Sequence, residues 1–276
     1  MKKIFALFLA LLSIGAYSQT TTEEFKAGYE RQVRNVGLSG PGVETILDRW
    51  EEAFPDDKDM LLGRYSFYYG KSRTVEVVPK DKQRFMGNKP TFTLKDEKGN
   101  PVNYFEENMF DDEYFAKSQQ VLDRIIGMYP DELLYQCAKI TSMLEYEKES
   151  PELAPLELAK LIDVFSKNHP AWTYDGEKVT AEDFADIIQQ YCATLYQVGT
   201  DVAYEAFKNI STSMNKLFPK NVAFIDNLGS YWLVAQRNYK KAISYYNKAL
   251  KLDGSDETAS KNRKVAEREM EKSKKK

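Results

Sequence analysis

The stretch from residue 221 to residue 254 constrains the fold of this chain more than any other. Its second half places apolar side chains at positions i, i+1, i+4, i+7 and i+8, namely Ala242, Ile243, Tyr246, Ala249 and Leu250. This spacing forms one stripe of a 3.6-residue helix. The first half carries Gly229, and small residues such as Gly229 and Ala242 let two antiparallel helices approach closely. The stretch therefore predicts a tightly packed helical hairpin.

Proline residues divide the rest of the chain into similar segments. Each proline follows an amphipathic run and stands where a helix should end. These stops are Phe54-Pro55, Tyr129-Pro130, His169-Pro170 and Phe218-Pro219. Their spacing is compatible with a repeat of about 34 residues that carries insertions. The sequence LGRY at residues 62–65 also repeats LGSY at residues 228–231. The pattern predicts an array of helical hairpins rather than a single one.

The best-preserved unit resembles the tetratricopeptide repeat (TPR), a helix-turn-helix repeat of about 34 residues. The residues that carry this resemblance are Ile225, Leu228, Gly229, Trp232, Ala242, Tyr246 and Gly254. Ile225 stands where the family has tryptophan, Gly254 stands where it has proline, and the turn holds one extra residue. The resemblance implies an all-α, TPR-like fold of stacked helical hairpins in a right-handed superhelix, with a concave surface that binds a protein or peptide.

Helical periodicity and the stops predict the position of each helix. The expected helices are 21–36, 41–53, 57–71, 111–127, 131–147, 152–167, 180–197, 201–216, 221–235, 239–251 and 255–271. The expected domain division is a signal peptide at 1–18, N-terminal hairpins at 19–72, an insertion at 73–110, TPR-like repeats at 111–254, and a C-terminal helix with a basic tail at 255–276.

Two insertions interrupt the helical pattern. The first, at residues 73–110, contains the alternating stretch TFTLKDEKGNPVNYF around a Gly99-Asn100 turn, which predicts a small β-hairpin. The second carries Trp172 and Tyr174. If the aromatic side chains of both insertions were exposed on one face, they would favour stacking against a sugar. The aromatic residues concerned are Phe92, Tyr104, Trp172 and Tyr174.

The N-terminus has the order of a secretory signal peptide. Two lysines precede an apolar run from Ile4 to Ile14, and small residues follow up to Ser18. The run is about half of the roughly 20 residues that span a membrane. We therefore expect an exported bacterial protein, cleaved near Ser18 and Gln19, without a membrane anchor, in the periplasm or outside the cell.

Composition narrows the possible partners and the redox chemistry. The net charge of −3 provides no basic field for nucleic acid. Cys137 and Cys192 are the two cysteines, and both lie in apolar helical stretches. In an oxidising compartment they could form one disulfide, or they could be two small buried residues.

The residues typical of catalysis are scarce. His169 is the single histidine, and it stands beside a proline in a helix-ending loop. A nucleophilic device would need a base held by its neighbours, and a zinc site would need more histidine or cysteine. The acidic clusters at residues 56–59 and 111–113 fit helix starts, where carboxylates cap free N–H groups. We expect no catalytic residues, no cofactor and no metal.

The predicted function is therefore binding. The TPR resemblance implies that Asp226, Asn227, Ser230 and Leu233 face the groove, and the second insertion adds Trp172 and Tyr174 as candidate contacts. The expected partner is another protein or peptide, held by a scaffold or adaptor. The alternative is a glycan-binding or nutrient-uptake accessory protein of the cell envelope.

Overall fold

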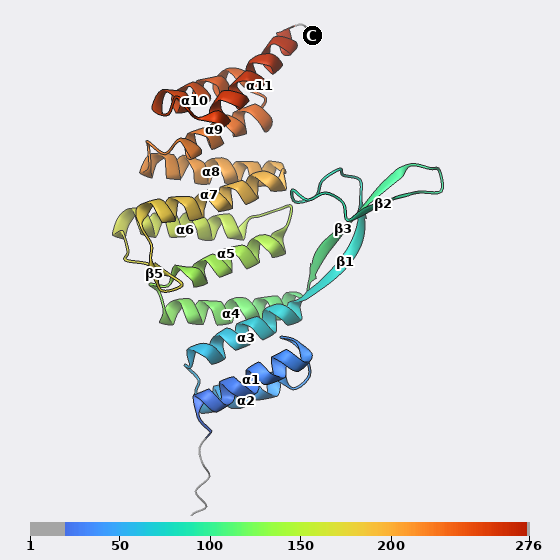
Figure 1. Cartoon of the computed structure of the whole chain (residues 1–276), viewed down its shortest axis with the longest axis vertical. Helices are drawn as coiled ribbons and strands as arrows, with labels where there is room; N and C mark the ends of the chain where they lie inside the picture. Colours follow the sequence, from blue (N-terminus) through green and yellow to red (C-terminus); the bar gives the residue numbers. More distant parts are fainter. Residues whose placement is uncertain (1–19, 275–276) are drawn as a thin grey trace, which may run out of the picture. The chain divides into compact units, whose positions relative to one another are not determined.

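The structure of the chain is a computed structural model that describes residues 20–274 (Figure 1). The expected signal peptide lies outside these residues. Helices dominate the described part, and they form stacked hairpins with a small β insertion, so the predicted fold class is confirmed. The superhelix and its handedness stay predictions. The helices are α1 (Thr22–Val36), α2 (Val43–Ala53), α3 (Lys58–Ser72), α4 (Asp112–Met128), α5 (Leu133–Glu147), α6 (Leu153–Asn168), α7 (Ala181–Val198), α8 (Asp201–Leu217), α9 (Val222–Val234), α10 (Tyr239–Leu252) and α11 (Glu257–Lys274).

Every predicted helix is present, and its ends lie within three residues of the expected positions. The reason is local chemistry at the ends. At each predicted stop the residue before the proline donates its N–H to the carbonyl four residues earlier and closes the helix there. These closing residues are Phe54, Tyr129, His169 and Phe218. At the other end, Thr180 forms a capping box with Asp183, and the Asp111 carboxylate accepts from the N–H of Tyr114.

The chain divides into two compact units, with the boundary after Phe67 inside α3. The first unit contains α1, α2 and the first part of α3. Its core is formed around Leu47 and Trp50, which are buried. A Cβ on Gly63 would lie 3.0 Å from the Leu47 side chain and 3.1 Å from the Tyr29 ring. The glycine of the LGRY stretch is therefore a close-approach position within this unit.

In the second unit, helices that are neighbours in the sequence pack on one another. Contacts also join alternate helices, since α6 contacts α8, α7 contacts α9, and α9 contacts α11. This is the pattern expected of stacked repeats. A core cluster runs through α5 to α9, and at its centre the rings of Phe165 and Phe184 stack with their centroids 4.1 Å apart. Cys137 and Cys192 are buried in this cluster as free thiols.

The hairpin of α9 and α10 has the close contact that the sequence predicts. A Cβ on Gly229 would lie 2.6 Å from an atom of the Tyr246 ring, which is closer than real Cβ atoms come to a neighbour. Ala242 is fully buried beside it. A smaller core cluster joins this hairpin to α11 through Ala259 and Ala266.

The insertion between α3 and α4 is an antiparallel sheet with the strand order β1-β3-β2. The strands are β1 (Arg73–Lys80), β2 (Phe92–Lys95) and β3 (Pro101–Phe110). The predicted hairpin is confirmed as β2 and β3, with Phe92 opposite Tyr104. The strand β1 was missing from the prediction. In Figure 1 the sheet projects from the side of the helices of the second unit. A second hairpin, β4 (Thr173–Tyr174) and β5 (Glu177–Lys178), precedes α7.

Candidate functional site

The predicted groove residue Asn227 lies inside the helix packing. It is 8% exposed, and its amide joins α9 to two other helices. Its Nδ2 donates to Oε1 of Gln189 at 2.7 Å and to Oγ of Ser211 at 3.2 Å. The Gln189 amide donates in return to Oδ1 of Asn227 at 3.1 Å. Asn227 thus helps to align α7, α8 and α9, and its side chain does not face an open groove.

Asp226 is also buried, at the boundary between α9 and α11. It is 6% exposed, and its Oδ1 has no hydrogen-bond partner. Burial, followed by the neighbouring carboxylate of Asp256, raises the pKa of Asp226 to about 7. Asp256 caps α11 by accepting from the N–H of Ala259. The neutral carboxyl of Asp226 therefore packs between the helices, and its ionised form destabilises the fold.

The other two predicted groove positions are partly buried. The hydroxyls of Ser230 and Tyr246 lie 3.1 Å apart and share a hydrogen bond. Leu233 packs against the cluster that joins α9 and α10 to α11. A role of these four α9 residues in binding a partner stays a prediction.

The two aromatic residues of the second insertion have different surroundings. Trp172 is 3% exposed and packs on Phe165, with ring centroids 6.2 Å apart. The expectation that Trp172 is exposed is wrong, because its indole fills the core at the end of α6. Tyr174 is 39% exposed.

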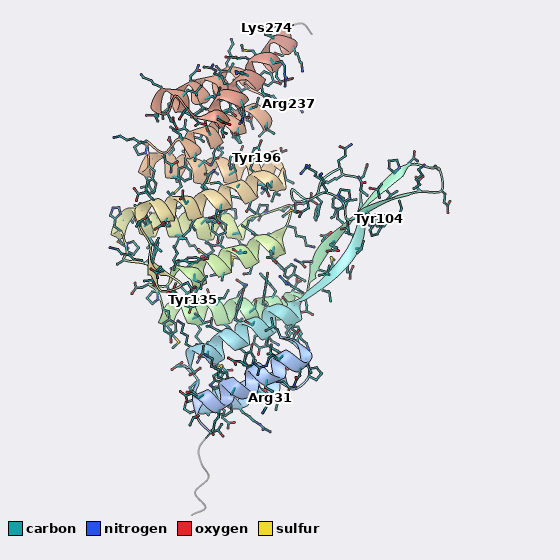
Figure 2. All side chains as sticks on the ribbon, in the orientation of Figure 1. Arg31, Tyr104, Tyr135, Tyr196, Arg237 and Lys274 are labelled. Atoms are coloured by element: carbon teal, nitrogen blue, oxygen red, sulfur yellow. The ribbon has the colours of Figure 1, made fainter. Side chains whose placement is uncertain are left out.

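The aromatic residues of the two insertions do not gather on one face. Figure 2 shows Tyr104 on the projecting sheet, on the opposite side of the helices from Tyr135 of α5. The β4–β5 hairpin lies beside the start of α5, since Glu132 and Thr173 form a β-bridge. A sugar platform built from both insertions is therefore not formed.

The projecting sheet, in contrast, has exposed apolar side chains on one face, where they stand beside the polar side chains of Glu106 and Asn108. Side chains alternate between the two faces of a strand, so the register decides which residues share a face. The register puts six apolar residues on one face, which we call the apolar sheet face: Val75, Val77, Phe92, Leu94, Val102 and Tyr104. The exposed fractions are 64% for Val75, 48% for Val77, 42% for Phe92 and 54% for Leu94. The Phe92 and Tyr104 rings stack with centroids 4.9 Å apart.

The opposite face of the sheet is packed around Phe105 and contains the paired charges of Glu107. Phe105 is buried against Phe85 of the loop between β1 and β2, with ring centroids 5.9 Å apart. Lys80 and Lys148 each pair with Glu107, at 2.8 and 2.6 Å. Burial opposes ionisation of Glu107, but the hydrogen bonds from these two lysines outweigh it and lower its pKa.

Contacts at its base and from the loop between β1 and β2 hold the sheet against the helices. Lys82 pairs with Glu149 just after α5, and Arg73 pairs with Glu145 at 2.9 Å. At Gly87 the loop approaches α7 so closely that a Cβ would lie 3.0 Å from the Gln197 side chain. These contacts therefore hold the sheet that carries the apolar sheet face in a fixed position on the helices of the second unit.

An antiparallel sheet with one face packed usually has its apolar residues on that face and polar residues towards water. Here the solvent face carries the valines, the leucine and the stacked aromatic pair in addition to the polar Glu106 and Asn108. Exposed apolar patches of this kind mark interaction sites. The alternation in TVEVV could have predicted β1, but the sequence does not say which face the helices and the loop cover.

The residues that could take part in catalysis either end a helix or are buried in the core. His169 closes α6 in a left-handed conformation with φ of 43°. Burial raises the pKa of Cys137 to about 11 and that of Cys192 to about 12, which disfavours reactive thiolates. Residues 20–274 contain no group of three or more histidine, cysteine or acidic side chains placed to hold a metal ion. None of the helices in this range has the length and apolar character to cross a membrane.

Comparison with known proteins gives similarity in structure but not in sequence. No protein-family model matches the chain, and no curated protein matches it in sequence. A solved structure described as the crystal structure of the P58(IPK) TPR domain aligns with 92% of this chain at 13% sequence identity and a TM-score of 0.32. The chain covers 57% of the length of that structure. A TM-score this low supports no argument, so the fold and the site rest on the geometry described above.

Proposed function

We propose that the chain is an exported, TPR-like scaffold that binds another protein through the apolar sheet face, without catalysing a reaction. The observation that carries the proposal is the exposure of Val75, Val77, Phe92 and Leu94 together on the solvent face of the sheet. Covering this face removes exposed valine, leucine and aromatic surface from water, and apolar burial contributes about 25 cal/mol per Å². The stacked helices and the contacts at the base of the sheet give this face a fixed support.

Site-specific photocrosslinking tests the proposal in the organism that expresses the chain. A photoreactive amino acid at Val75 or Leu94 should give a discrete adduct with one protein. The matched control is the same amino acid at Lys178, which is exposed in the other insertion. Adducts of equal yield at Lys178, or no adduct at either sheet position, would contradict the proposal.

A charge variant separates binding from folding. Val75→Glu combined with Leu94→Glu should abolish the adduct from a photoreactive residue at Val77. The melting temperature should stay unchanged, because both side chains are exposed. Retention of the unmodified chain on a polysaccharide, with loss of retention in this variant, would instead favour the glycan-binding alternative.

The export part of the proposal rests on the N-terminal sequence. Cell fractionation should recover the chain outside the cytoplasm, and sequencing of its N-terminus should start near Gln19. A cytoplasmic chain that keeps Met1 would contradict this part and leave the binding proposal standing.

A further inference from the structure

The outer edge of β1 has no strand beside it. In the sheet order β1-β3-β2, β1 pairs along its whole length with β3 and has no second strand neighbour among residues 20–274. None of the backbone hydrogen bonds outside the helices and strands of this described range involves residues 73–80. A free edge presents a row of N–H and C=O groups that can pair with another extended chain.

Two observations show which residues of β1 turn their backbone outwards. The carbonyl of Tyr104 accepts from the N–H of Thr91, so Tyr104 directs its backbone towards the β2 side. Pro79 is opposite Tyr104 and has no N–H, which fits a position that directs its backbone away from β3. Since backbone direction alternates along a strand, Arg73, Val75 and Val77 also present their N–H and C=O groups on the free edge.

Pro79 limits the usable length of this edge. Proline on an edge strand is a common protection against pairing, and here it leaves the part from Arg73 to Val77 open. The open part from Arg73 to Val77 spans five residues, roughly 17 Å at about 3.4 Å per residue. An edge this short, taken alone, offers too little surface for a stable interface, which buries roughly 800 Å² per partner. The edge therefore fits a short segment of a partner protein better than a second copy of this chain.

The side chains of β1 specify what such a segment should contain. Val75 and Val77 belong to the apolar sheet face, so residues opposite them extend that face if they are apolar. Glu76 lies between them on the other face and opposite Glu107 of β3. Glu107 is already paired with two lysines, whereas Glu76 has no ion pair within residues 20–274. A basic residue opposite Glu76 would supply the missing partner.

We propose that the free edge of β1 binds an extended segment of a partner protein as an added antiparallel strand. The segment has an apolar residue, a basic residue and a second apolar residue in succession. The two apolar residues exchange backbone hydrogen bonds with Val75 and Val77. The basic residue faces Glu76 in a non-hydrogen-bonded pair, where the side chains come closest. This inference rests on the proposed function and names the chemistry of the partner.

A synthetic peptide tests the proposal with the full chain. The probe is the capped heptapeptide Ser-Thr-Val-Lys-Val-Thr-Ser with a fluorophore at its N-terminus, and binding is measured by fluorescence anisotropy. The matched control carries N-methyl groups on both valines, which removes the donors to β1 and leaves the side chains unchanged. We expect the control to bind at least tenfold more weakly. Equal binding of the two peptides overturns the proposal, as does no binding of the probe at millimolar concentration.

A charge exchange tests the role of Glu76 without disturbing the fold, because this side chain is exposed. The Glu76→Lys variant should lose affinity for the probe and gain affinity for the same peptide with glutamate in place of lysine. Each change should be at least fivefold. If the variant ranks the two peptides as the original chain does, the proposed pairing is wrong.

Two further outcomes separate the possible errors. If sedimentation shows that the peptide-free chain is a dimer that Val77→Pro dissociates, the edge pairs with a second copy and the proposal fails. If photoadducts form at Val75 while the peptide does not bind, the proposed function stands and the added strand is excluded.

Discussion

Gly229 has no side chain, which allows α9 and α10 to approach closely. A methyl group there would lie 2.6 Å from the Tyr246 ring, and that ring is fully buried. Gly229→Ala should therefore lower the free energy of unfolding by about 1–3 kcal/mol, as overpacked cores do. Urea denaturation followed by circular dichroism measures the change.

The control for this substitution is Gly127→Ala in α4, where a Cβ meets nothing within 4 Å. Alanine there should leave stability unchanged or raise it by up to about 1 kcal/mol, because it reduces the freedom of the unfolded chain. Equal destabilisation by the two substitutions would show that Tyr246 does not restrict position 229.

The buried carboxyl of Asp226 makes stability depend on pH. Its pKa is raised from 3.8 to about 7, so the folded chain holds a proton that the unfolded chain releases. Stability from this group is full below pH 3.8 and is lost as the pH rises towards 7. Asp226→Asn should flatten this part of the profile and raise stability at pH 8 by about 1–3 kcal/mol. Thermal melting of both proteins from pH 4 to pH 8 measures it, and parallel profiles would contradict the assignment.

The same residues show what sequence could not reveal at this scale. The glycine was predictable, because only a small side chain suits the repeat pattern at that position. Asp226 and Asn227 were expected to face a groove, because the TPR resemblance implies that position for them. Their burial depends on α7, α8 and α11, which approach from distant parts of the sequence.

At the scale of the element, helix ends were predictable because their signals are local. Thr180, Asp111 and the residues before the proline stops make their capping bonds within four positions in the sequence. The strand β1 was missed although TVEVV alternates, because its pairing partner β3 lies some 30 residues away across a loop. The packed face of the sheet was not predictable either, since it depends on Phe85 and on α5.

Trp172, just before the β4–β5 hairpin, packs its indole into the core cluster of α5 to α9. Trp172→Ala should remove the contact with Phe165 and Phe184 and lower the free energy of unfolding by about 3–5 kcal/mol. Tyr174→Ala is the matched control and should change stability by less than about 0.5 kcal/mol, because this residue is exposed. Similar losses from the two variants in chemical denaturation would contradict the buried position of the indole.

At the scale of the whole molecule, the array consists of layers that each depend on their neighbours. The cluster that joins α9 and α10 to α11 is separate from the larger cluster of α5 to α9. Truncating the chain before residue 257 exposes the cluster that joins α9 and α10 to α11. The backbone amides of α9 and α10 should then lose protection against hydrogen exchange, because terminal helices cap a repeat array.

Hydrogen exchange measured by mass spectrometry tests this prediction. Exchange in α9 and α10 should accelerate at least tenfold in the truncated chain, while α4 to α6 keep their protection. A uniform acceleration through all these helices would show that the second unit unfolds as one cooperative block.

The burial of the two free thiols determines how the protein reacts with alkylating reagents. Cys137 and Cys192 lie in the cluster of α5 to α9, and burial keeps both protonated at neutral pH. An alkylating reagent can reach them only when those helices open. The rate of modification at each cysteine therefore reports local opening of the helix around it. The two native cysteines thus serve as probes, and no engineered one is needed. Comparing their alkylation rates would show whether α5 and α7 open together.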